Sequence, residues 1–389
     1  MNQELLKHKF SDIFYSNGYL RYYFSPGRIN VIGEHIDYNG GLVFPCAISL
    51  GTYAVISLRK DNIVSLYSEN FPKVGIVSFS LKDELEKDNL WTDYVKGVVS
   101  EIKKLGHEIN QGFNAYIVGN LPNGASLSSS ASLELLFGEI IRDLNDLPLT
   151  DLDLVKIGQN AENKFVGLHC GIMDQFAIGM SKKDHAILLD CATLKYDYAP
   201  LKLKDNVILI LNTNKRRDLV TSKYNERRAE CDEALAIIQK DYKKVNFLCE
   251  LEESDLLSIK PLVKNEVVYN RLKHVVMEMD RVKKAFNALN DGNLEYVGKL
   301  LNASHESLKN DYEVTGKELD TIVAAAQACD GVLGARMIGA GFAGCAIAIV
   351  NKDCVETVIQ KVKEVYLAEI GYDCDIYVAE TSDRTKKIA

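Results

Sequence analysis

The sequence has few of the features that mark secreted, membrane-spanning or disordered chains. Its 389 residues include only seven prolines and one tryptophan. The longest uncharged apolar stretch, residues 337–350, is rich in glycine and shorter than the ~20 residues that a membrane-spanning helix needs. The N-terminus has no basic segment followed by an apolar one, so no secretory signal is visible. We therefore expect a globular protein of the cytoplasm.

Paired cysteines and an excess of positive charge are also missing. The nine cysteines are odd in number and scattered, and no C-x-x-C occurs. This pattern indicates free thiols in a reducing compartment, without a disulfide framework or a zinc site. Lys and Arg number 46 against 54 Asp and Glu, which gives a net charge of −8. We expect neither a general nucleic-acid partner nor binding to an anionic membrane, although this balance is compatible with a local basic pocket.

The remaining composition is that of an ordinary folded protein, with 47% apolar and 26% charged residues. Its length suggests two or three domains, with a boundary near residues 180–200. Strands are predicted at residues 53–58, 63–67, 115–118, 207–211, 346–350 and 375–378. Helices are predicted at residues 128–144, 150–168, within 222–310, at 316–328, and in a segment that ends near 370. Thr150 and Asp153 resemble a capping box at the start of the second of these helices. This mixed order favours an α+β fold over a doubly wound parallel sheet.

A first unusual segment, residues 26–41, concentrates polar groups beside an apolar run. It contains Arg28, Glu34, His35 and Asp37. Carboxylates beside amide and imidazole groups suit sugar hydroxyls, which both donate and accept hydrogen bonds. A polar hairpin with a type I′ turn at residues 39–40 would give the same pattern without any ligand. A metal site on His35 is disfavoured, because no second His or Cys lies at ligand spacing.

A second segment, residues 121–131, is a run of small residues that enters a predicted helix. Free N–H groups and the positive end of the helix dipole favour an anion at such a helix start. The three hydroxyls of residues 128–130 could add donors to phosphate or ligands to magnesium. A turn followed by a serine-capped helix explains the same pattern. A Walker A loop is excluded, because no Gly-Lys-Ser/Thr follows.

Two further segments contain carboxylates and glycines. Glu162 lies at the edge of the apolar stripe of its predicted helix, where a partly desolvated carboxylate would be stabilised by a nearby cation. Asp174 lies among apolar residues, and such an Asp more often caps a helix than acts as a base, unless Arg28 meets it in space. Residues 339–344 read G-A-G-F-A-G. A predicted strand, not a helix, follows them, so we interpret them as a ligand loop and not as a Rossmann fingerprint.

Taken in order, these segments resemble the galactokinase branch of the GHMP small-molecule kinases. The matching stretches are residues 27–41, 127–134, 161–176, 212–216, 222–228, 304–314 and 336–344. The resemblance covers about residues 20–380. It implies a two-lobed α+β kinase with mixed sheets and helices, an N-terminal domain at 1–185, a C-terminal domain at 186–389, and an active site between the lobes. It further implies ATP-dependent phosphorylation of the C1 hydroxyl of α-D-galactose in galactose breakdown. We expect a monomer.

The resemblance also implies roles for individual residues. Asp174 would be the catalytic carboxylate and Arg28 its partner. Galactose would be bound by Arg28, Glu34, His35, Asp37, Gly171, Asp174 and Tyr224. The nucleotide would be bound by Trp91, Gly124, Ala125, Ser126, Leu127, Ser128, Ser129 and Ser130. Magnesium would be held by Ser130 and Glu162. Core packing is the alternative role for Trp91.

Several positions depart from the family pattern. Ser126 and Ala343 replace usual glycines. Other departures are Ile36, Ile338, Ala192 and Arg384. If Ser126 and Ala343 need a left-handed backbone, each Cβ would cost about 1–2 kcal/mol, and nucleotide binding would weaken. Two rival functions are a GHMP kinase for galactosamine, N-acetylgalactosamine or arabinose, and a non-catalytic galactose sensor. The intact serine run, Glu162 and Asp174 argue against the sensor.

Overall fold

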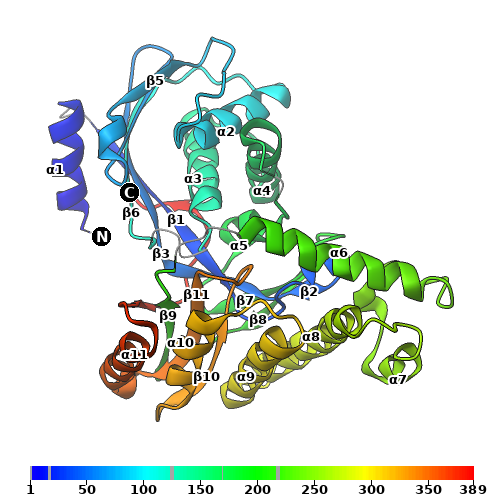
Figure 1. The fold of residues 1–389 in the computed structure, drawn as a ribbon. Helices are drawn as coiled ribbons and strands as arrows, with labels where there is room; N and C mark the ends of the chain where they lie inside the picture. The colour runs from blue at the N-terminus through cyan, green and yellow to red at the C-terminus, as the bar shows by residue number, and fades with distance from the viewer. Residues whose placement is uncertain (1, 16–18, 123–126, 169, 216–219) are drawn as a thin grey trace.

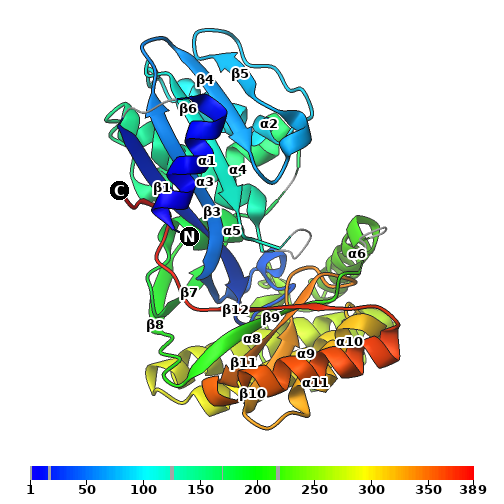
Figure 2. The same ribbon diagram turned by 90° about the vertical axis from the view of Figure 1, so that its left-hand side faces the viewer.

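The computed structural model describes residues 2–15, 19–122, 127–168, 170–215 and 220–389. A six-stranded sheet has the order β13-β1-β3-β6-β4-β5, and all its pairs are antiparallel except β4 with β6. Its strands are β1 (Leu20–Asn30), β3 (Pro45–Leu58), β4 (Ile63–Ser68), β5 (Val77–Ser80), β6 (Phe113–Gly119) and β13 (Lys386–Lys387). The last strand comes from the C-terminal end of the chain, which returns to the first lobe (Figure 2).

Helices cover both faces of this sheet. One face carries α2 (Thr92–Lys104), α3 (Ser129–Leu144), α4 (Asp151–Asn160) and α5 (Met173–Met180), and the other carries α1 (Gln3–Phe14) (Figure 1). Successive side chains of a strand point to opposite faces. Val55 of β3 accordingly packs with Phe10 of α1, whereas Ile56 belongs to the larger core beneath α2 and α3. The period-2 pattern of β3 therefore places two helical layers around one sheet.

A second lobe is built on a four-stranded antiparallel sheet of order β10-β11-β9-β12. Its strands are β9 (Asn206–Asn212), β10 (Val332–Met337), β11 (Cys345–Asn351) and β12 (Asp375–Ala379). Its main helices are α6 (Val220–Ile238), α8 (Glu266–Asn290), α9 (Leu294–Asn310), α10 (Lys317–Gln327) and α11 (Val355–Ile370). The apolar core of this lobe includes Ile29, Val31 and Ile36, so the segment that begins in β1 is packed against both lobes.

A small three-stranded sheet joins β2 (Leu42–Val43), β7 (His185–Asp190) and β8 (Tyr196–Pro200). Short helical turns complete the chain. They are η1 (Asp37–Asn39), η2 (Pro72–Val74), η3 (Ala161–Val166), η4 (Leu248–Glu250), η5 (Glu253–Asp255), α7 (Leu256–Ile259) and η6 (Lys352–Cys354). Within the described residues, no helix has both the length and the apolar character to cross a membrane.

The mixed α+β class is confirmed, and all six predicted strands exist. The capping box is also present, because the Thr150 hydroxyl accepts from the Asp153 amide at 3.2 Å and the Asp153 carboxylate accepts from the Thr150 amide at 2.8 Å. The predicted helix over 150–168 is wrong in one respect, because α4 ends at Asn160 and continues as a π-helical turn. The type I′ hairpin alternative at residues 39–40 is also wrong, since a 3₁₀ turn ends there at Gly40, with φ 74°.

Candidate active site

Arg28 and Asp174 meet in space, although 146 residues separate them along the chain. Arg28 follows a bulge in β1, and Asp174 lies in the first turn of α5. The Arg28 Nε and Nη2 atoms donate to the two carboxylate oxygens at 2.8 and 2.9 Å, which is the bidentate geometry of a strong ion pair. The Arg28 side chain is 8% exposed and that of Asp174 is 32% exposed. The carboxylate is therefore held on one side and accessible on the other.

The serine segment touches the same carboxylate. The hydroxyl of Ser128 donates to Asp174, and the backbone of Ser128 is left-handed with φ 61°, immediately before α3 begins. Leu127 is buried in the core, and its carbonyl oxygen accepts from the Arg28 amide at 3.2 Å. Gly27 permits this approach, because a Cβ there would lie 2.9 Å from that oxygen. The predicted nucleotide residues Gly124, Ala125 and Ser126 lie outside the described residues.

A pocket of about 280 Å³ opens beside the start of α3. Its lining includes Ser129, Ser130, Trp91, Tyr94 and Phe71. The Trp91 and Phe71 rings are nearly parallel, at 14°, with centroids 6.4 Å apart. Flat aromatic walls next to a helix N-terminus suit a planar base that carries an anionic chain. Tyr94 and Phe71 were missed by sequence reasoning, although Tyr94 lies only one helical turn beyond Trp91.

Glu162 lies on the π-helical turn, a local irregularity that is frequent at functional sites. Its Oε2 atom accepts from Gln175 Nε2 at 2.7 Å and from Cys170 Sγ at 3.3 Å, and the Ser130 side chain is close enough to influence the pKa of its carboxylate. Burial raises the pKa of Glu162, and the negative charge of Asp174 acts in the same direction. Among the described residues no three His, Cys, Asp or Glu side chains gather as a metal cluster.

A hydroxyl and a carboxylate from Ser130 and Glu162 nevertheless fit Mg²⁺. This ion prefers hard oxygen ligands, and it often takes only one or two of them from the protein and the rest from water and substrate phosphates. A second carboxylate, that of Glu134, also bonds to Gln175, at 2.9 Å. Burial raises the pKa of Glu134 well above its ordinary value, and the negative charge of Glu162 adds to this effect. Sequence reasoning did not single out Glu134 or Gln175.

A second pocket, of about 570 Å³, is lined in part by the chain segment 170–172, which precedes Asp174. Its lining includes the predicted residues Asp37, Gly171 and Tyr224. Gly171 lies close to Asp37, because a Cβ on it would be 3.5 Å from Asp37 Oδ2. Burial, with a contribution from the negative charge of Glu34, raises the pKa of Asp37 to about 6. Lining residues that sequence reasoning missed are Tyr38, Gln159, Cys191, Arg228 and Phe247.

Glu34 and His35 are buried next to this pocket, but neither belongs to its described lining. Glu34 Oε1 pairs with Arg336 Nη2 at 3.0 Å and accepts from the Gly339 amide at 2.9 Å. Arg336 also donates to the Val31 carbonyl oxygen at 2.8 Å. These contacts connect the segment that contains Glu34 to β10 of the second lobe, and they engage only one of its two carboxylate oxygens.

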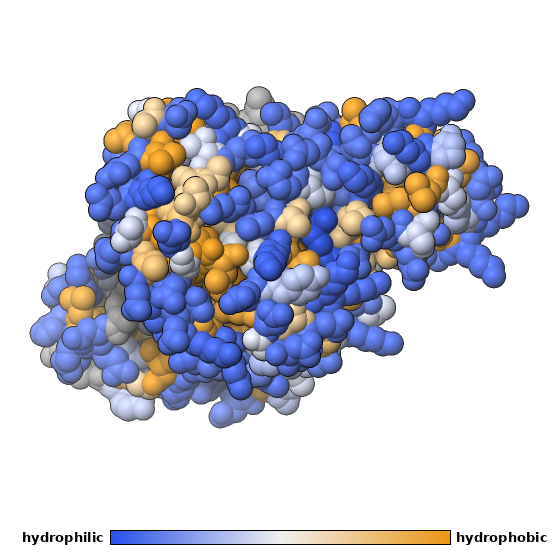
Figure 3. Space-filling model, turned by 90° about the horizontal axis from the view of Figure 1, so that it is seen from below, coloured by the Kyte–Doolittle hydropathy of each residue, from blue (hydrophilic) through white to orange (hydrophobic). Residues whose placement is uncertain are grey.

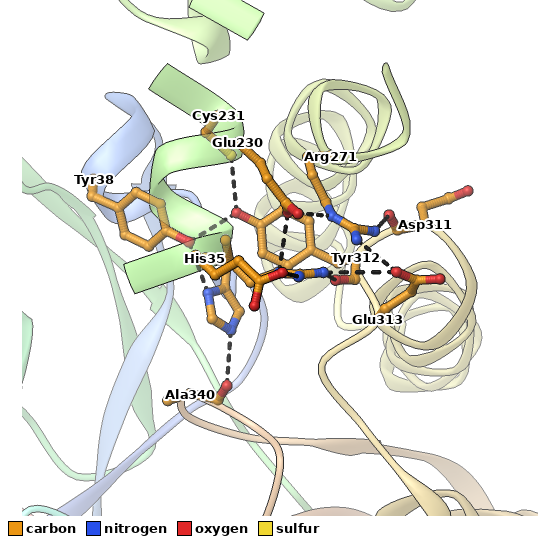
Figure 4. A network of polar contacts seen from close by, with 11 residues as sticks. His35, Tyr38, Glu230, Cys231, Arg271, Asp311, Tyr312, Glu313 and Ala340 are labelled. Carbon is orange, nitrogen blue, oxygen red and sulfur yellow. Dashed lines mark hydrogen bonds and ion pairs between the residues drawn. The ribbon is translucent and has the colours of Figure 1, made fainter. Parts of the chain in front are cut away.

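Both ring nitrogens of His35 are occupied (Figure 4). Nδ1 lies 2.9 Å from the Tyr38 hydroxyl, and Nε2 lies 3.2 Å from the Ala340 carbonyl oxygen. Since a carbonyl only accepts, Nε2 carries the proton and Tyr38 donates to Nδ1. Burial lowers the pKa of His35 to about 3, so the ring is neutral. A sugar hydroxyl that bound this ring would have to displace Tyr38 or Ala340.

A network of tyrosines and charges supports this side of the site (Figure 4). The Tyr38 hydroxyl lies 2.8 Å from that of Tyr312. Arg271 of α8 is fully buried, and its three nitrogens donate to Glu230 Oε2 at 2.7 Å, to the Asp311 carbonyl oxygen at 2.6 Å and to Glu313 Oε2 at 2.6 Å. Because Glu230 lies in α6, the network anchors the helix that also carries Tyr224.

The glycine-rich loop joins β10 to the antiparallel β11, which is not a Rossmann arrangement. Gly341 has φ 77°, and a Cβ there would lie 2.1 Å from the Val314 carbonyl oxygen. Ala343 is not among the described residues with positive φ, so the condition for backbone strain at this departure is not met. The other departures are placed as follows: Ile36 and Ile338 are buried, Ala192 lines the second pocket, and Arg384 pairs with Asp151 at 3.1 Å.

Comparisons with known proteins agree on one family. A galactokinase galactose-binding signature matches residues 8–58, the GHMP kinases N terminal domain matches 93–182, and the GHMP kinases C terminal domain matches 283–368. The chain is 54% identical to the galactokinase of Staphylococcus saprophyticus and 51% identical to that of Lactiplantibacillus plantarum, and each comparison covers 100% of both chains.

Solved structures give the same grouping. The galactokinase of Lactococcus lactis, in complex with galactose, superposes with a TM-score of 0.92 at 48% identity, covering 99% of this chain and 100% of that one. The mevalonate kinase of Methanococcus jannaschii superposes with a TM-score of 0.70 at 19% identity, over 95% of this chain and 100% of that one. The likeness to this mevalonate kinase shows a shared fold.

Proposed function

This chain belongs to the galactokinase family of the GHMP kinases, and we propose that its Asp174–Arg28 pair is the centre at which galactose is phosphorylated. The reaction transfers the γ-phosphoryl group of ATP to the C1 hydroxyl of α-D-galactose and releases ADP. The observation that supports this centre best is the position of the ion pair. Asp174 is bonded to Ser128 at the start of α3, beside the nucleotide pocket, and lies three residues beyond Gly171 of the second pocket.

Asp174 would receive the C1 hydroxyl of galactose on its exposed side. A positioned carboxylate can orient the hydroxyl and accept its proton, and such groups typically contribute ~10²–10⁴ in rate. Phosphoryl transfer passes through a loose transition state, so the proton can leave late. Arg28 would keep Asp174 oriented through both carboxylate oxygens and would stabilise the negative charge on the transferring group.

The second pocket is proposed as the galactose site. Asp37 would accept hydrogen bonds from sugar hydroxyls, and Tyr224 and the Gly171 backbone would complete the wall. Glu34 would contribute the carboxylate oxygen that Arg336 and Gly339 leave available. His35 stays a proposed sugar residue, but its occupied ring nitrogens favour a supporting role behind the pocket wall.

The first pocket is proposed as the nucleotide site. Trp91 would pack against the base, and residues 124–130 would surround the phosphates at the N-terminus of α3. Ser130 and Glu162 would hold Mg²⁺, which when bound would neutralise charge on the phosphate oxygens. The oxygen donor set supports this assignment.

Three wider properties are also proposals. We propose domains at residues 1–185 and 186–389, a monomeric state and a cytoplasmic location. The odd number and scattered spacing of the nine cysteines, with no C-x-x-C, support a reducing compartment. Figure 3 shows one face of the molecule, which is mainly hydrophilic and has hydrophobic residues gathered near its centre. Light scattering coupled to size-exclusion chromatography tests the oligomeric state, and a mass near 87 kDa, about twice 43.4 kDa, would refute the monomer.

The reaction is tested by ADP release from Mg·ATP. The sugars compared are D-galactose, D-galactosamine, N-acetylgalactosamine, L-arabinose, D-glucose and none. We expect galactose-dependent ADP release, with a sugar 1-phosphate identified by ³¹P NMR. A faster reaction with one of the other sugars would change the substrate assignment. Galactose binding without ADP release would support the sensor alternative.

A further inference from the structure

Two buried carboxylates at the proposed active site share one amide group. The Nε2 atom of Gln175 lies 2.9 Å from Oε2 of Glu134 and 2.7 Å from Oε2 of Glu162. An amide nitrogen carries two hydrogen atoms, so each carboxylate can accept one of them. Gln175 is fully buried and Glu134 is 1% exposed, so water does not compete for these bonds. Glu134 and Glu162 are thereby held at a fixed separation.

The bridge restricts the orientation of Glu162. Its Oε2 atom accepts hydrogen bonds from the Gln175 amide and the Cys170 thiol. A carboxylate anchored through one oxygen presents its other oxygen to a ligand in a defined direction. Ser130 lies near the Glu162 carboxylate, because its side chain contributes to the pKa of that group, and it lines the proposed nucleotide pocket.

Packing alone does not account for a glutamate at position 134. Its Oε1 atom and the Oε1 atom of Gln175 are both buried without a hydrogen-bond partner in the part of the chain that the structure describes. A buried, incompletely bonded carboxylate is less favourable than an apolar side chain of similar volume. Glu134 follows Ser130 by one turn on the same face of α3, and so it is placed toward the proposed magnesium ligands.

We propose that Glu134 is a positioning residue that orients the Glu162 carboxylate through Gln175, so that Glu162 and Ser130 can meet one Mg²⁺ ion. This inference rests on the proposed function, in which Glu162 is a magnesium ligand. Glu134 acts here as a hydrogen-bond acceptor and does not itself touch substrate or metal. Loss of such an outer partner typically weakens metal binding 10–100-fold.

The test measures how much magnesium strengthens nucleotide binding. Trp91 is the only tryptophan and lines the proposed nucleotide pocket, so its fluorescence can follow ADP binding directly. ADP is titrated once with Mg²⁺ and once with EDTA, and the ratio of the two dissociation constants isolates the metal-dependent part. This readout does not depend on turnover.

Glu134→Leu should reduce this ratio about tenfold or more, without changing ADP affinity in EDTA. Glu134→Gln should keep the ratio within about threefold of the parent, because an amide oxygen still accepts from Gln175. Glu101→Leu is the matched control, since Glu101 is another buried glutamate, paired with Lys104 on α2. Its ratio should be unchanged.

An unchanged ratio in Glu134→Leu would overturn the proposal. Equal losses in Glu134→Leu and Glu134→Gln would also overturn it, because charge and not orientation would then be responsible. If Glu134→Leu does not fold, Gln175→Met removes the same bridge and must show the same loss. A parent protein whose ratio responds to Mg²⁺ but that does not phosphorylate galactose would refute the proposed function and still leave the role of Glu134 measurable.

Discussion

Acidic pH should weaken galactose binding through Asp37. Burial, reinforced by the charge of Glu34, raises the pKa of Asp37 from 3.8 to about 6. Sugar hydroxyls donate to an ionised carboxylate, so the ionised form should bind galactose best. Its fraction falls from roughly nine-tenths at pH 7 to roughly one-tenth at pH 5. We therefore predict that KM for galactose rises about tenfold between these two pH values.

The assay is the initial rate of ADP release at saturating Mg·ATP, with galactose varied between pH 5 and pH 8. Asp37→Asn should have a raised KM for galactose at every pH, with little pH dependence. KM for ATP is the internal control, because Asp37 is not among the described lining of the nucleotide pocket. A parent KM for galactose that stays flat down to pH 5 would refute the role of Asp37 as an ionised acceptor.

The same pKa shift has an opposite consequence for stability. A carboxyl group whose pKa is raised on folding favours the folded state most below its unfolded value, near 3.8, and this contribution is lost as the pH rises through about 6. A shift of about two units corresponds to ~3 kcal/mol, which partial exposure of Asp37 to the pocket reduces to about 1–2 kcal/mol. Asp37→Asn should therefore raise Tm at pH 7.5 and not at pH 4. A lower Tm at pH 7.5 would contradict this explanation.

Three further predictions concern residues around the site. Arg271→Met should lower the free energy of unfolding by about 2 kcal/mol, measured by urea unfolding, and should raise KM for galactose, because Glu230 and Glu313 beside α6 lose their charged hydrogen bonds to Arg271 and keep Arg227 as an ion-pair partner. An unaltered KM would separate this network from the sugar site. Gly341→Ala should destabilise the protein by at least about 1–2 kcal/mol, and Ala343→Gly by less than about 1 kcal/mol. Of these two positions, 341 has a left-handed backbone and no room for a Cβ, whereas 343 is not among the described residues with positive φ. The reverse order in thermal unfolding would contradict this explanation. Glu162→Gln should raise the Mg²⁺ concentration for half-maximal activity about tenfold or more, and a magnesium dependence equal to that of the parent would remove Glu162 from the ligand set.

The sequence was most informative where spacing is local. The capping box at Thr150 and the apolar strands β9 and β11 depend on neighbouring residues, and all are present. The ordered motifs also identified Asp37, Gly171 and Tyr224, which do meet in one pocket.

Contacts between distant segments could not be predicted in the same way. Spacing alone gave no reason for Arg28 to meet Asp174, and the partner of His35 at Ala340 lies 305 residues away. The π-helical turn at Glu162 was missed because its sequence continues the apolar period of α4. Whether Ala343 needs a left-handed backbone could not be decided from the sequence, because φ depends on how the whole loop closes onto Val314.

The central claim is that the Asp174–Arg28 pair performs the transfer, and Asp174→Asn tests it most directly. Galactose binding by calorimetry and ³¹P NMR detection of galactose 1-phosphate should be measured on the same sample. Asp143→Asn is the matched control, because Asp143 forms a similar ion pair with Arg21 at 2.7 Å, with comparable exposure, on the first lobe. We predict that Asp174→Asn folds and binds galactose within about tenfold of the parent but loses at least ~10²-fold in turnover, while Asp143→Asn stays active. Turnover by Asp174→Asn close to that of Asp143→Asn would contradict the claim.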